Sequence, residues 1–387
     1  MLSKLRLGLL ASRSCAKFNS VQEGILSLTA LTNNKRELHT ENGREIKKQY
    51  SVGLFGCGRI AGVHLKNILR NRRLDLKWIV EQDQDRFQEV KEQFVLGDEI
   101  KFHLPSDRDQ LLSDKSLDAV IVVSPTNTHT EYICQSLKQG KAVFTEKPAG
   151  ESVSDIRTCY ETAEDKGLTL VTGYTRRFDA EFCDVKNAVD NGVLGKLQCI
   201  KTTTRDSPKP SYTFLKTADS SGCNILADLG VHDIDMIVWL TKAQKPESIF
   251  INCHVQDDEL KECGQPDSMA GMIKYPDGTL VTMDVFRESC YGYDIRLEAF
   301  GTQGMAMAEN PRESSTIIDG IGGGRSRRLF NSFPQRFEAP FEAEIAHFVD
   351  CLDGKTVPLI TKDESLRVAE IIEKGVQSYK EKRLVMF

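Results

Sequence analysis

Three titratable residues near the middle of the chain have the spacing of one helix face. Asp228, His232 and Asp235, in the stretch "ILADLGVHDIDM", are separated by four and three positions, so a helix would stack them. An imidazole beside a carboxylate is an acid–base pair, in which we expect Asp228 to orient the ring of His232. Asp235 would then bind a polar ligand. The alternative is a solvated helix edge with one histidine satisfied in the core.

A lysine is the second candidate for chemistry. Lys147, in "TEKP", follows the apolar run Ala142 to Thr145 and directly precedes Pro148. Most lysines are solvated surface residues, and spacing alone leaves that alternative open. At the carboxyl end of a buried parallel strand, however, a lysine lies where ligands of α/β proteins bind. There its ammonium group could stabilise an alkoxide.

The elements that must position these groups begin at "GLFGCGRIAG". The apolar run Val52 to Phe55 predicts a buried strand, and Ile60 to Leu69 has helical spacing. Between them, Gly56 permits a tight turn, Gly58 lets the backbone approach a pyrophosphate, and Ala61 allows close packing of helix on strand. Such a triplet of small residues also occurs in ordinary turns, so its context has to decide.

An acidic residue supplies that context. Leu76 to Val80 predicts a second buried strand, which ends at Glu81, 25 residues after Gly56. An acid in this position holds the ribose hydroxyls in dinucleotide-binding folds. Because Glu81 would repel a 2′-phosphate, the pattern predicts NAD as the cofactor and makes NADP the less favoured one.

The alternation of strands and helices continues to about residue 174. Strands are expected at Ala119 to Val123, Ala142 to Thr145 and Leu168 to Thr172, with helices at Thr128 to Gln139 and Val153 to Lys166. This pattern is typical of a mainly parallel, doubly wound sheet, in which ligands gather at the carboxyl ends of strands. The polar turns "SPTNTH" and "EKP" both follow such ends.

The pattern changes after about residue 180. Strand-like runs separated by turn signals follow one another: Leu197 to Thr204, Ile249 to Val255, Met269 to Tyr275, Leu280 to Arg287 and Asp294 to Phe300. They predict an α+β domain with a large, mostly antiparallel open sheet. "DGIGGGRSRR" is typical of a solvated hairpin loop, since it lacks the Lys-Ser/Thr of a phosphate-binding loop.

Composition excludes several classes of protein. The chain has 387 residues, of which 40% are hydrophobic, and a net charge of −5, so nucleic acid is not expected as a partner. No apolar stretch has the length that spans a bilayer, so no membrane partner is expected. The 11 cysteines are scattered without a disulfide or metal-ligand pattern, which predicts a reducing compartment and no metal.

The first 49 residues differ from the rest. "MLSKLRLGLLASRSCAKFNS" is basic, rich in Ser, Leu and Ala, and contains no acid. This composition is typical of a mitochondrial transit peptide, and a disordered N-terminus is the alternative. The location is therefore the mitochondrial matrix or the cytoplasm. We expect an extension and linker at 1–49, a dinucleotide-binding domain at 50–174 and an α+β domain at 175–387, whose last helices could pack back on the first domain.

These motifs together resemble the Gfo/Idh/MocA family of oxidoreductases. "GCGRIAG", "TEKPAG", "GYTRRFD" and "ILADLGVHDIDM" carry the resemblance, which covers roughly residues 50–387. "YGYDIRLEAFGTQG" and "RFEAPFEAEIAHFVDCL" are similar to the inositol 2-dehydrogenase branch. The resemblance implies a Rossmann domain, a second domain with an open sheet, and NAD(P)-dependent oxidation of a sugar or cyclitol. It also implies a homodimer or homotetramer formed through that sheet.

The resemblance also implies roles for particular residues. The catalytic lysine of the family falls on Lys147, its Asp and His fall on Asp228 and His232, and its substrate-binding Asp falls on Asp235. His232 would take the hydroxyl proton and Lys147 would stabilise the alkoxide. The expected substrate contacts are Lys147, Asp206, Asp228, His232, Asp235 and Tyr293, with Thr126 as a weaker candidate. The expected cofactor contacts are Gly56, Gly58, Arg59, Ile60, Ala61, Glu81, Ser124, Pro125, Thr126, His129, Glu146, Lys147 and Arg177.

Two departures and two alternatives accompany this interpretation. Many family members have Asp where this chain has Glu81, and Cys57 lies inside the glycine turn. The most closely implied reaction is oxidation of myo-inositol to the 2-keto inosose. One alternative is another branch of the family that acts on an aldose or a trans-dihydrodiol. The other is a nucleotide-sensing regulator without activity, although a regulator should have lost Lys147 or the Asp–His pair.

Overall fold

The computed structural model of the chain describes residues 40–41, 44–45, 48–217, 225–262, 264–321 and 323–387. It contains two compact units, 1–48 and 49–387. In the first unit, β1 (Thr40–Glu41) and β2 (Arg44–Glu45) pair antiparallel. The predicted transit peptide lies outside the described residues. Everything below concerns the second unit.

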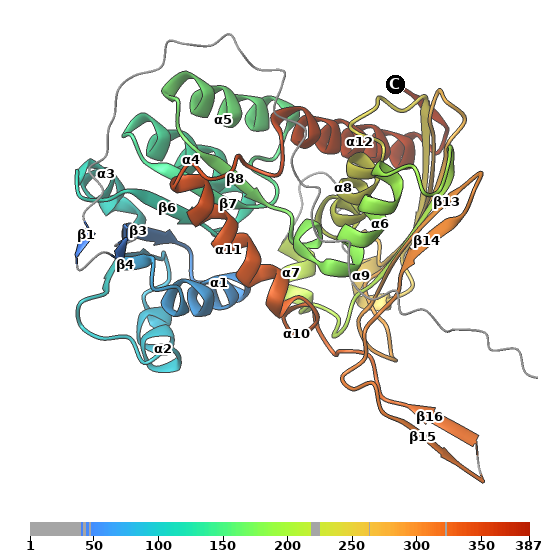
Figure 1. Ribbon diagram of the computed structural model, residues 1–387, viewed down its shortest axis with the longest axis horizontal. Coiled ribbons are helices and arrows are strands. Elements are labelled where there is room, and N and C mark those ends of the chain that lie inside the picture. The colour runs from blue at the N-terminus through green and yellow to red at the C-terminus, as the bar shows by residue number, and fades with distance from the viewer. Residues whose placement is uncertain (1–39, 42–43, 46–47, 218–224, 263, 322) are drawn as a thin grey trace, which may run out of the picture. The chain divides into compact units, whose positions relative to one another are not determined.

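The first half of this unit contains a parallel sheet of six strands (Figure 1). The strands are ordered β5-β4-β3-β6-β7-β8. Successive strands are added on one side from β3 to β5 and on the other side from β6 to β8, so β3 and β6 flank the topological switch point where dinucleotides bind. Most of the strand residues are apolar and buried, because helices cover both faces of a doubly wound sheet. The strands are β3 (Tyr50–Phe55), β4 (Leu74–Val80), β5 (Lys101–His103), β6 (Ala119–Val122), β7 (Ala142–Glu146) and β8 (Leu170–Gly173).

Helices from both ends of the chain cover this sheet. On one face, α1 (Arg59–Arg70) and α2 (Asp85–Gln93) share an apolar cluster with α11 (Glu338–Leu352). On the other face, α3 (Arg108–Ser113), α4 (His129–Lys138) and α5 (Val153–Lys166) share one with α12 (Lys362–Glu381). The C-terminal helices therefore complete the core of the first half of the unit.

The second half contains a sheet of seven strands in the order β14-β13-β9-β12-β11-β10-β17, in which the β9–β12 pair is parallel and the other pairs are antiparallel. The predicted fold class is confirmed. The strands are β9 (Leu197–Arg205), β10 (Ser248–His254), β11 (Ser268–Lys274), β12 (Leu280–Phe286), β13 (Asp294–Gly301), β14 (Met305–Ala308) and β17 (Val385–Met386).

In the described part of the chain, helices cover one face of this sheet. Strand residues alternate between buried and exposed, and α8 (Val231–Leu240) and α12 pack on the buried side (Figure 1). The remaining helices are α6 (Ala180–Asp190), α7 (Tyr212–Thr217), α9 (Asp258–Lys261) and α10 (Phe333–Arg336). The opposite face exposes large apolar side chains, including Phe250, Met272, Leu280, Phe286 and Phe300.

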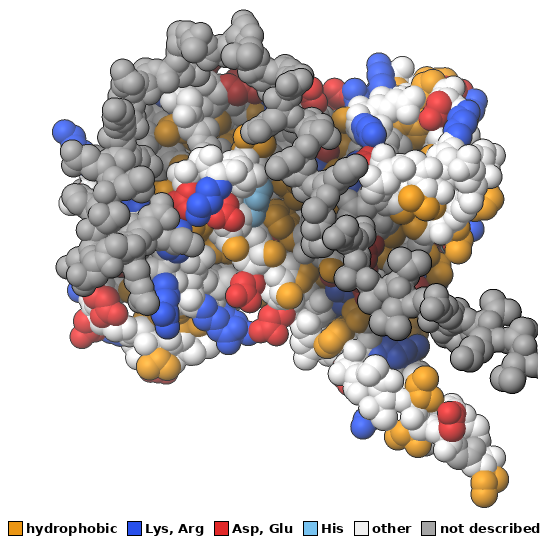
Figure 2. Space-filling model, in the orientation of Figure 1, with side chains coloured by type: hydrophobic (Ala, Val, Ile, Leu, Met, Phe, Trp, Pro, Cys, Tyr) orange, Lys and Arg blue, Asp and Glu red, His pale blue; other side chains and the backbone are white. Residues whose placement is uncertain are grey.

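The glycine-rich segment forms a hairpin, as its sequence predicts. Strands β15 (Ile317–Gly320) and β16 (Gly323–Ser326) pair with each other. Ile317, Ile318 and Ile321 are exposed, and hydrophobic side chains are visible at the hairpin tip in Figure 2.

One local feature differs from the predicted helix around His232. Residues Ile225–Gly230 form a π-helical turn, and the α-helix begins only at Val231. A π-turn has more residues per turn than an α-helix, so Asp228 and His232 do not keep the α-helical stacking that their spacing predicts.

Among the described residues, no helix is both long and apolar enough to cross a membrane.

Candidate active site

The glycine turn lies at the switch point of the parallel sheet. Gly56 has φ +102°, and a Cβ atom at this position would lie 2.7 Å from the backbone N and Cα of Ser124. Ser124 follows the end of β6, so the turn passes directly against the neighbouring strand's end. Only glycine combines this positive φ with this close approach.

Gly58 differs from Gly56 because it faces open space. It is the N-cap of α1 and contributes no side-chain hydrogen bond to the helix end. A Cβ atom here would meet nothing within 4 Å. The N-terminus of α1 therefore presents backbone N–H groups beside a space without a side chain, which fits a pyrophosphate. Arg59 is exposed, Ile60 is half-buried and Ala61 is buried in this first turn.

Glu81 lies beside the same turn. Its Oε2 accepts a hydrogen bond from the backbone N of Cys57 at 2.7 Å, and its Oε1 accepts from the backbone N of Gln82 and Asp83 at 2.9 and 3.1 Å. The carboxylate is thus fixed at the end of β4 next to the glycines. This fold binds the NAD pyrophosphate in open space beside a glycine and the NAD ribose at an acid that follows the next strand. Gly58 and Glu81 supply these two features.

The turn after β6 is braced by side chains. Ser124 Oγ and Thr128 Oγ1 are 2.6 Å apart, while Pro125 is exposed and Thr126 is half-buried. His129, predicted to bind the cofactor, is 1% exposed, and its two ring nitrogens lie 2.7 Å from Pro148 O and 2.8 Å from Ser124 O. That prediction is corrected, because both nitrogens are occupied by backbone carbonyls. His129 instead ties this turn to the segment after Lys147.

Lys147 and Asp228 meet although they are far apart in the sequence. Lys147 Nζ donates to the backbone O of Asp228 at 3.0 Å and lies 3.6 Å from its Oδ1. Arg287 Nη1 donates to the other carboxylate oxygen of Asp228 at 2.7 Å. Burial would raise the pKa of Asp228, but the charges of Arg287 and Lys147 outweigh it and lower the pKa below its ordinary value.

His232 is half-buried near these groups. Burial, and then the positive charges of Lys147 and Arg176, lower its pKa well below the ordinary value. The ring is therefore neutral at pH 7 and able to accept a proton. Among the hydrogen bonds between described residues, none joins Asp228 to His232. The predicted orienting bond is corrected: the π-turn changes the register, and the Asp228 carboxylate lies against Arg287 and Lys147 instead.

Asp206 and Tyr293 contribute further polar groups. Both are buried, at 6% and 5% exposure. Burial raises the pKa of Asp206 to about 6, with Arg287 and Arg59 opposing and Asp228 adding to the shift. Burial also raises the pKa of Tyr293, and Arg176, Asp206 and Asp233 are among the charges that act on it. Asp206 thus lies in the electrostatic neighbourhood of Asp228 and of the start of α1.

Two predicted contact residues form a core ion pair instead. Arg177, expected at the cofactor, is 1% exposed and donates to both Asp235 carboxylate oxygens at 2.7–3.1 Å and to Glu364 at 2.8 Å. Asp235, expected to bind substrate, is itself 1% exposed. A buried guanidinium needs such partners. We therefore correct both assignments: Arg177 links α8, through Asp235, to α12, through Glu364.

The sequence interpretation missed Arg287 and the neighbouring pair Arg176–Asp233. Arg176 Nη1 donates to Asp233 at 3.0 Å, and both side chains are buried. Arg287 directly follows β12. An arginine that closes an apolar strand is a signal for a buried ion pair, but nothing in the sequence names Asp228 as its partner.

Comparison with known proteins decides the family. Residues 50–174 match the oxidoreductase family with an NAD-binding Rossmann fold, and residues 182–307 match the Gfo/Idh/MocA C-terminal domain. A myo-inositol 2-dehydrogenase of Thermotoga maritima is 30% identical over 335 residues, which cover 86% of this chain and 97% of that protein. The chain belongs to the Gfo/Idh/MocA oxidoreductase family. It is an NAD-dependent oxidoreductase, as the motifs predict.

Two further relatives are also inositol dehydrogenases. A scyllo-inositol 2-dehydrogenase (NAD⁺) of Bacillus subtilis is 28% identical and covers 82% of this chain and 90% of its own length. The crystal structure of scyllo-inositol dehydrogenase from Lactobacillus casei, with bound NAD(H) and scyllo-inositol, superposes with a TM-score of 0.79 at 25% identity. That match covers 88% of this chain and 99% of the other.

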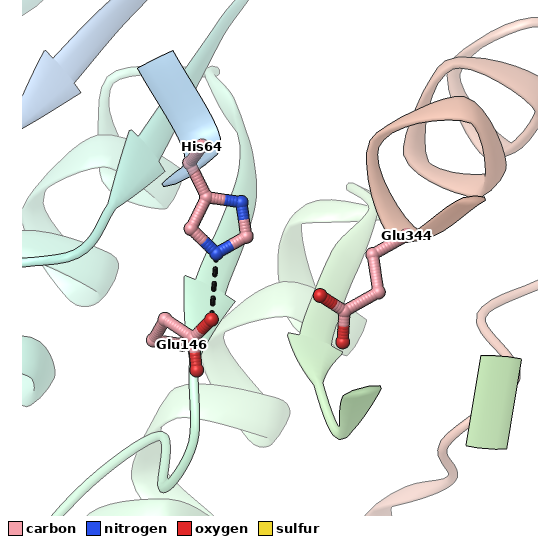
Figure 3. Close-up of side chains that lie close together, drawn as sticks. All are labelled: His64, Glu146 and Glu344. Atoms are coloured by element: carbon pink, nitrogen blue, oxygen red, sulfur yellow. Dashed lines mark hydrogen bonds and ion pairs between the residues drawn. The ribbon is translucent and has the colours of Figure 1, made fainter. Parts of the chain in front are cut away.

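A second titratable cluster lies deeper in the first half of the unit. His64, Glu146 and Glu344 are buried, and their nitrogen and oxygen atoms lie within 4.8 Å of one another (Figure 3). Of the described residues, this is the one group whose donors could surround a metal ion. The absence of a metal stays a prediction. Glu146, expected at the cofactor, contacts His64 through Oε1 and the backbone N of Lys147 through Oε2.

Proposed function

We propose that this chain oxidises a secondary hydroxyl of a cyclitol with NAD, most closely myo-inositol to the 2-keto inosose. The observation that carries the proposal is the contact of Lys147 Nζ with Asp228, because it joins the end of β7 to the turn that leads into α8 and His232. The similarity to myo- and scyllo-inositol dehydrogenases supports a cyclitol as the substrate.

Oxidation of a secondary alcohol removes a proton from oxygen and a hydride from carbon. His232 takes the proton at a ring nitrogen, since its lowered pKa keeps it neutral and available. Lys147 donates to the substrate oxygen and stabilises its developing negative charge. Asp228 holds the Lys147 ammonium group in place, and Arg287 holds Asp228.

The cofactor, when bound, accepts the hydride at the nicotinamide ring. Gly56, Gly58 and the first turn of α1 would bind its pyrophosphate, and Glu81 its ribose hydroxyls. For the polyol, Asp206 and Tyr293 would supply hydrogen bonds, and Thr126 remains a further candidate. Asp206 is the best placed, because Asp228, Arg287 and Arg59 all act on its carboxyl group.

A substrate panel tests the proposal. Purified protein is incubated with myo-inositol, scyllo-inositol, aldoses and a trans-dihydrodiol, each with NAD and with NADP, and reduced nicotinamide is followed by absorbance. We expect the highest kcat/KM with an inositol and NAD. A higher value with an aldose or a dihydrodiol would move the chain to another branch, and no turnover of any compound would favour a regulator.

The exposed apolar face of the seven-stranded sheet supports an oligomer. Phe250, Met272, Leu280, Phe286 and Phe300 are 36–52% exposed on β10, β11, β12 and β13, and large apolar side chains exposed on one face of a sheet are typical of a subunit interface. We propose a homodimer or homotetramer through this face. Light scattering of the protein and of Met272→Glu tests it: the variant should dissociate, and an unchanged mass would contradict the proposal.

The N-terminal residues carry a separate proposal about location. The first 22 residues are basic and contain no acid, which supports import into the mitochondrial matrix. Deletion of residues 1–30 should leave turnover intact and abolish import in cells. An identical distribution of both forms would favour the cytoplasm.

A further inference from the structure

The cluster of His64, Glu146 and Glu344 joins three elements next to the proposed catalytic lysine, because Glu146 directly precedes Lys147 in the sequence. His64 comes from α1, Glu146 from the end of β7 and Glu344 from α11. His64 Nε2 and Glu146 Oε1 are 2.6 Å apart. In Figure 3 the Glu344 side chain extends from its helix toward these two groups.

Glu344 is unusual because it is a carboxyl group in the core with few polar neighbours. The residue is 0% exposed, as is His64. Among the described residues, Nδ1 of His64 and both Glu344 oxygens make no close hydrogen bond, and the Thr175 side chain is the one hydrogen-bonding group that acts on the Glu344 carboxyl group. The rings of Phe144 and Phe341 lie 5.2 and 5.5 Å from the His64 ring. A charged carboxylate in such dry surroundings would be strongly unfavourable.

Either a cation or a proton could neutralise this cluster, and the distances favour a proton. Two ligands of one zinc ion lie about 2.9 Å or more apart, because each is about 2 Å from the metal at 90° or more. His64 Nε2 and Glu146 Oε1 are closer than that, at a hydrogen-bonding distance of 2.6 Å. A metal bound by these two atoms would have to break this bond.

Electrostatics favours the same answer. Burial, and then the negative charge of Glu146, raise the pKa of Glu344 well above its ordinary value, although a hydrogen bond from the Thr175 side chain opposes them. Two carboxylates this close in a dry site do not both ionise.

We propose that Glu344 is a neutral, protonated acid and that it acts as a positioning residue for Lys147 through Glu146. The first link is proximity, since the donor atoms of Glu344, Glu146 and His64 lie within 4.8 Å of one another. Glu146 Oε1 then contacts His64, and Glu146 Oε2 accepts the backbone N–H of Lys147 at 3.2 Å. Lys147 in turn reaches Asp228. Because the α11 helix belongs to the C-terminal part of the chain, Glu344 couples that helix to the catalytic turn. The inference rests on the role proposed for Lys147.

Three substitutions separate this role from a purely structural one. Glu344→Gln is neutral and has nearly the same shape as a protonated glutamic acid. Glu344→Leu keeps much of the volume but removes both polar atoms. Glu342→Gln is the matched control, because Glu342 lies on the same helix with its side chain exposed.

The first measurement needs no substrate. At pH 8, where Asp206 is ionised, the difference between the infrared spectra of the native protein and Glu344→Gln should contain the carbonyl band of a protonated carboxylic acid, and the difference between the native protein and Glu342→Gln should not. Metal analysis of the purified protein should find no stoichiometric divalent ion. Absence of the band, or one equivalent of metal that disappears in Glu344→Gln, would overturn the protonated acid.

The second measurement follows turnover of myo-inositol with NAD. Glu344→Leu should lower kcat roughly tenfold to a hundredfold, since small displacements of a catalytic group have such effects, with little change in NAD affinity. Glu344→Gln should restore kcat to within about threefold. If Glu344→Leu does not fold, Glu344→Asp, which withdraws the carboxyl group, takes its place with the same expected loss. Unchanged kcat in the Leu or Asp variant, or failure of Gln to rescue, would overturn the positioning role.

Failure of the proposed function would look different. In that case the native protein itself would not oxidise myo-inositol, while the infrared and metal measurements would still decide whether Glu344 carries a proton.

Discussion

Arg287 Nη1 lies 2.7 Å from Asp228 Oδ2, and the Lys147 ammonium lies 3.6 Å from the other oxygen of that carboxylate. Two cations from different parts of the chain therefore share one anion. Asp228 stays ionised between them, since their charges lower its pKa despite burial. This arrangement makes Asp228 an anchor for Lys147 rather than a partner of the His232 ring.

Replacement of Arg287 tests the anchor. In Arg287→Met, Asp228 loses the cation that lowers its pKa most and is left with Lys147 as its cationic partner, so the position of the Lys147 ammonium group relative to substrate changes. We expect kcat to fall roughly tenfold to a hundredfold, while the Kd for NAD stays within about threefold of the native value. Steady-state kinetics and NAD titration on the same preparation measure both. A variant with native kcat would show that Arg287 has no part in positioning Lys147.

The two glycines of the turn should respond differently to alanine. Gly56→Ala places a Cβ 2.7 Å from the Ser124 backbone at φ +102°, and the positive φ alone costs about 1–3 kcal/mol of folding free energy. Gly58→Ala meets nothing within 4 Å and should keep the native Tm but lose NAD affinity. Thermal unfolding and NAD titration compare the pair. If Gly58→Ala binds NAD with native affinity, the pyrophosphate does not bind beside Gly58.

Glu81 should control the choice of cofactor. In Glu81→Gln the negative charge that repels a 2′-phosphate is gone, so the ratio of kcat/KM for NAD over NADP should narrow about tenfold or more, as loss of a charged hydrogen bond predicts. The single amide oxygen can replace only one of the two carboxylate oxygens, so either the Cys57 N–H or the Gln82 and Asp83 N–H groups lose their acceptor, and Tm should fall slightly. Preference of the native protein for NADP would contradict this role.

Asp206 should make stability depend on pH. Its pKa in the folded state is about 6, compared with 3.8 for the ordinary group, so between these values the folded state binds more protons than the unfolded one. The free energy of unfolding therefore falls as pH rises from 4 to 6. Because asparagine does not ionise, Asp206→Asn should abolish this fall in the free energy of unfolding and stabilise the protein at pH 7.5 by up to about 3 kcal/mol. The same substitution should raise KM for the polyol. Denaturant unfolding at pH 4 and pH 7.5 measures the difference. An equal stability change at both values would exclude titration of Asp206.

Local patterns predicted most of the scaffold. Apolar runs such as Val52 to Phe55 become buried parallel strands, and the Gly56–Gly58 turn and Glu81 meet at the switch point, because strand, turn and helix depend on neighbouring residues. The open sheet follows from alternating residues in β11 and β12. The packing of α11 and α12 on the parallel sheet depends on contacts between distant residues, which spacing does not encode.

The site itself was less predictable, for physical reasons. The i, i+4 rule assumes an α-helix, but the π-turn at Ile225–Gly230 changes which side chains stack. Arg177 and Asp235 are charged, which predicted contacts with the cofactor and the substrate, but the two side chains form an ion pair with each other in the core. Arg287 and Glu344 approach Asp228 and Glu146 from distant elements, and a single sequence contains no signal for such pairs.

The central claim is that His232 and Lys147 perform the chemistry, and turnover per folded molecule tests it most directly. kcat for myo-inositol with NAD is measured for the native protein, His232→Ala and Lys147→Met, with Tm and NAD affinity determined on the same samples. The account predicts a loss of about 10²–10⁴-fold in kcat for His232→Ala and a comparable loss for Lys147→Met, with NAD affinity and Tm near native. Near-native kcat per folded molecule in both variants, or a fall in Tm that accounts for the whole loss, would contradict it.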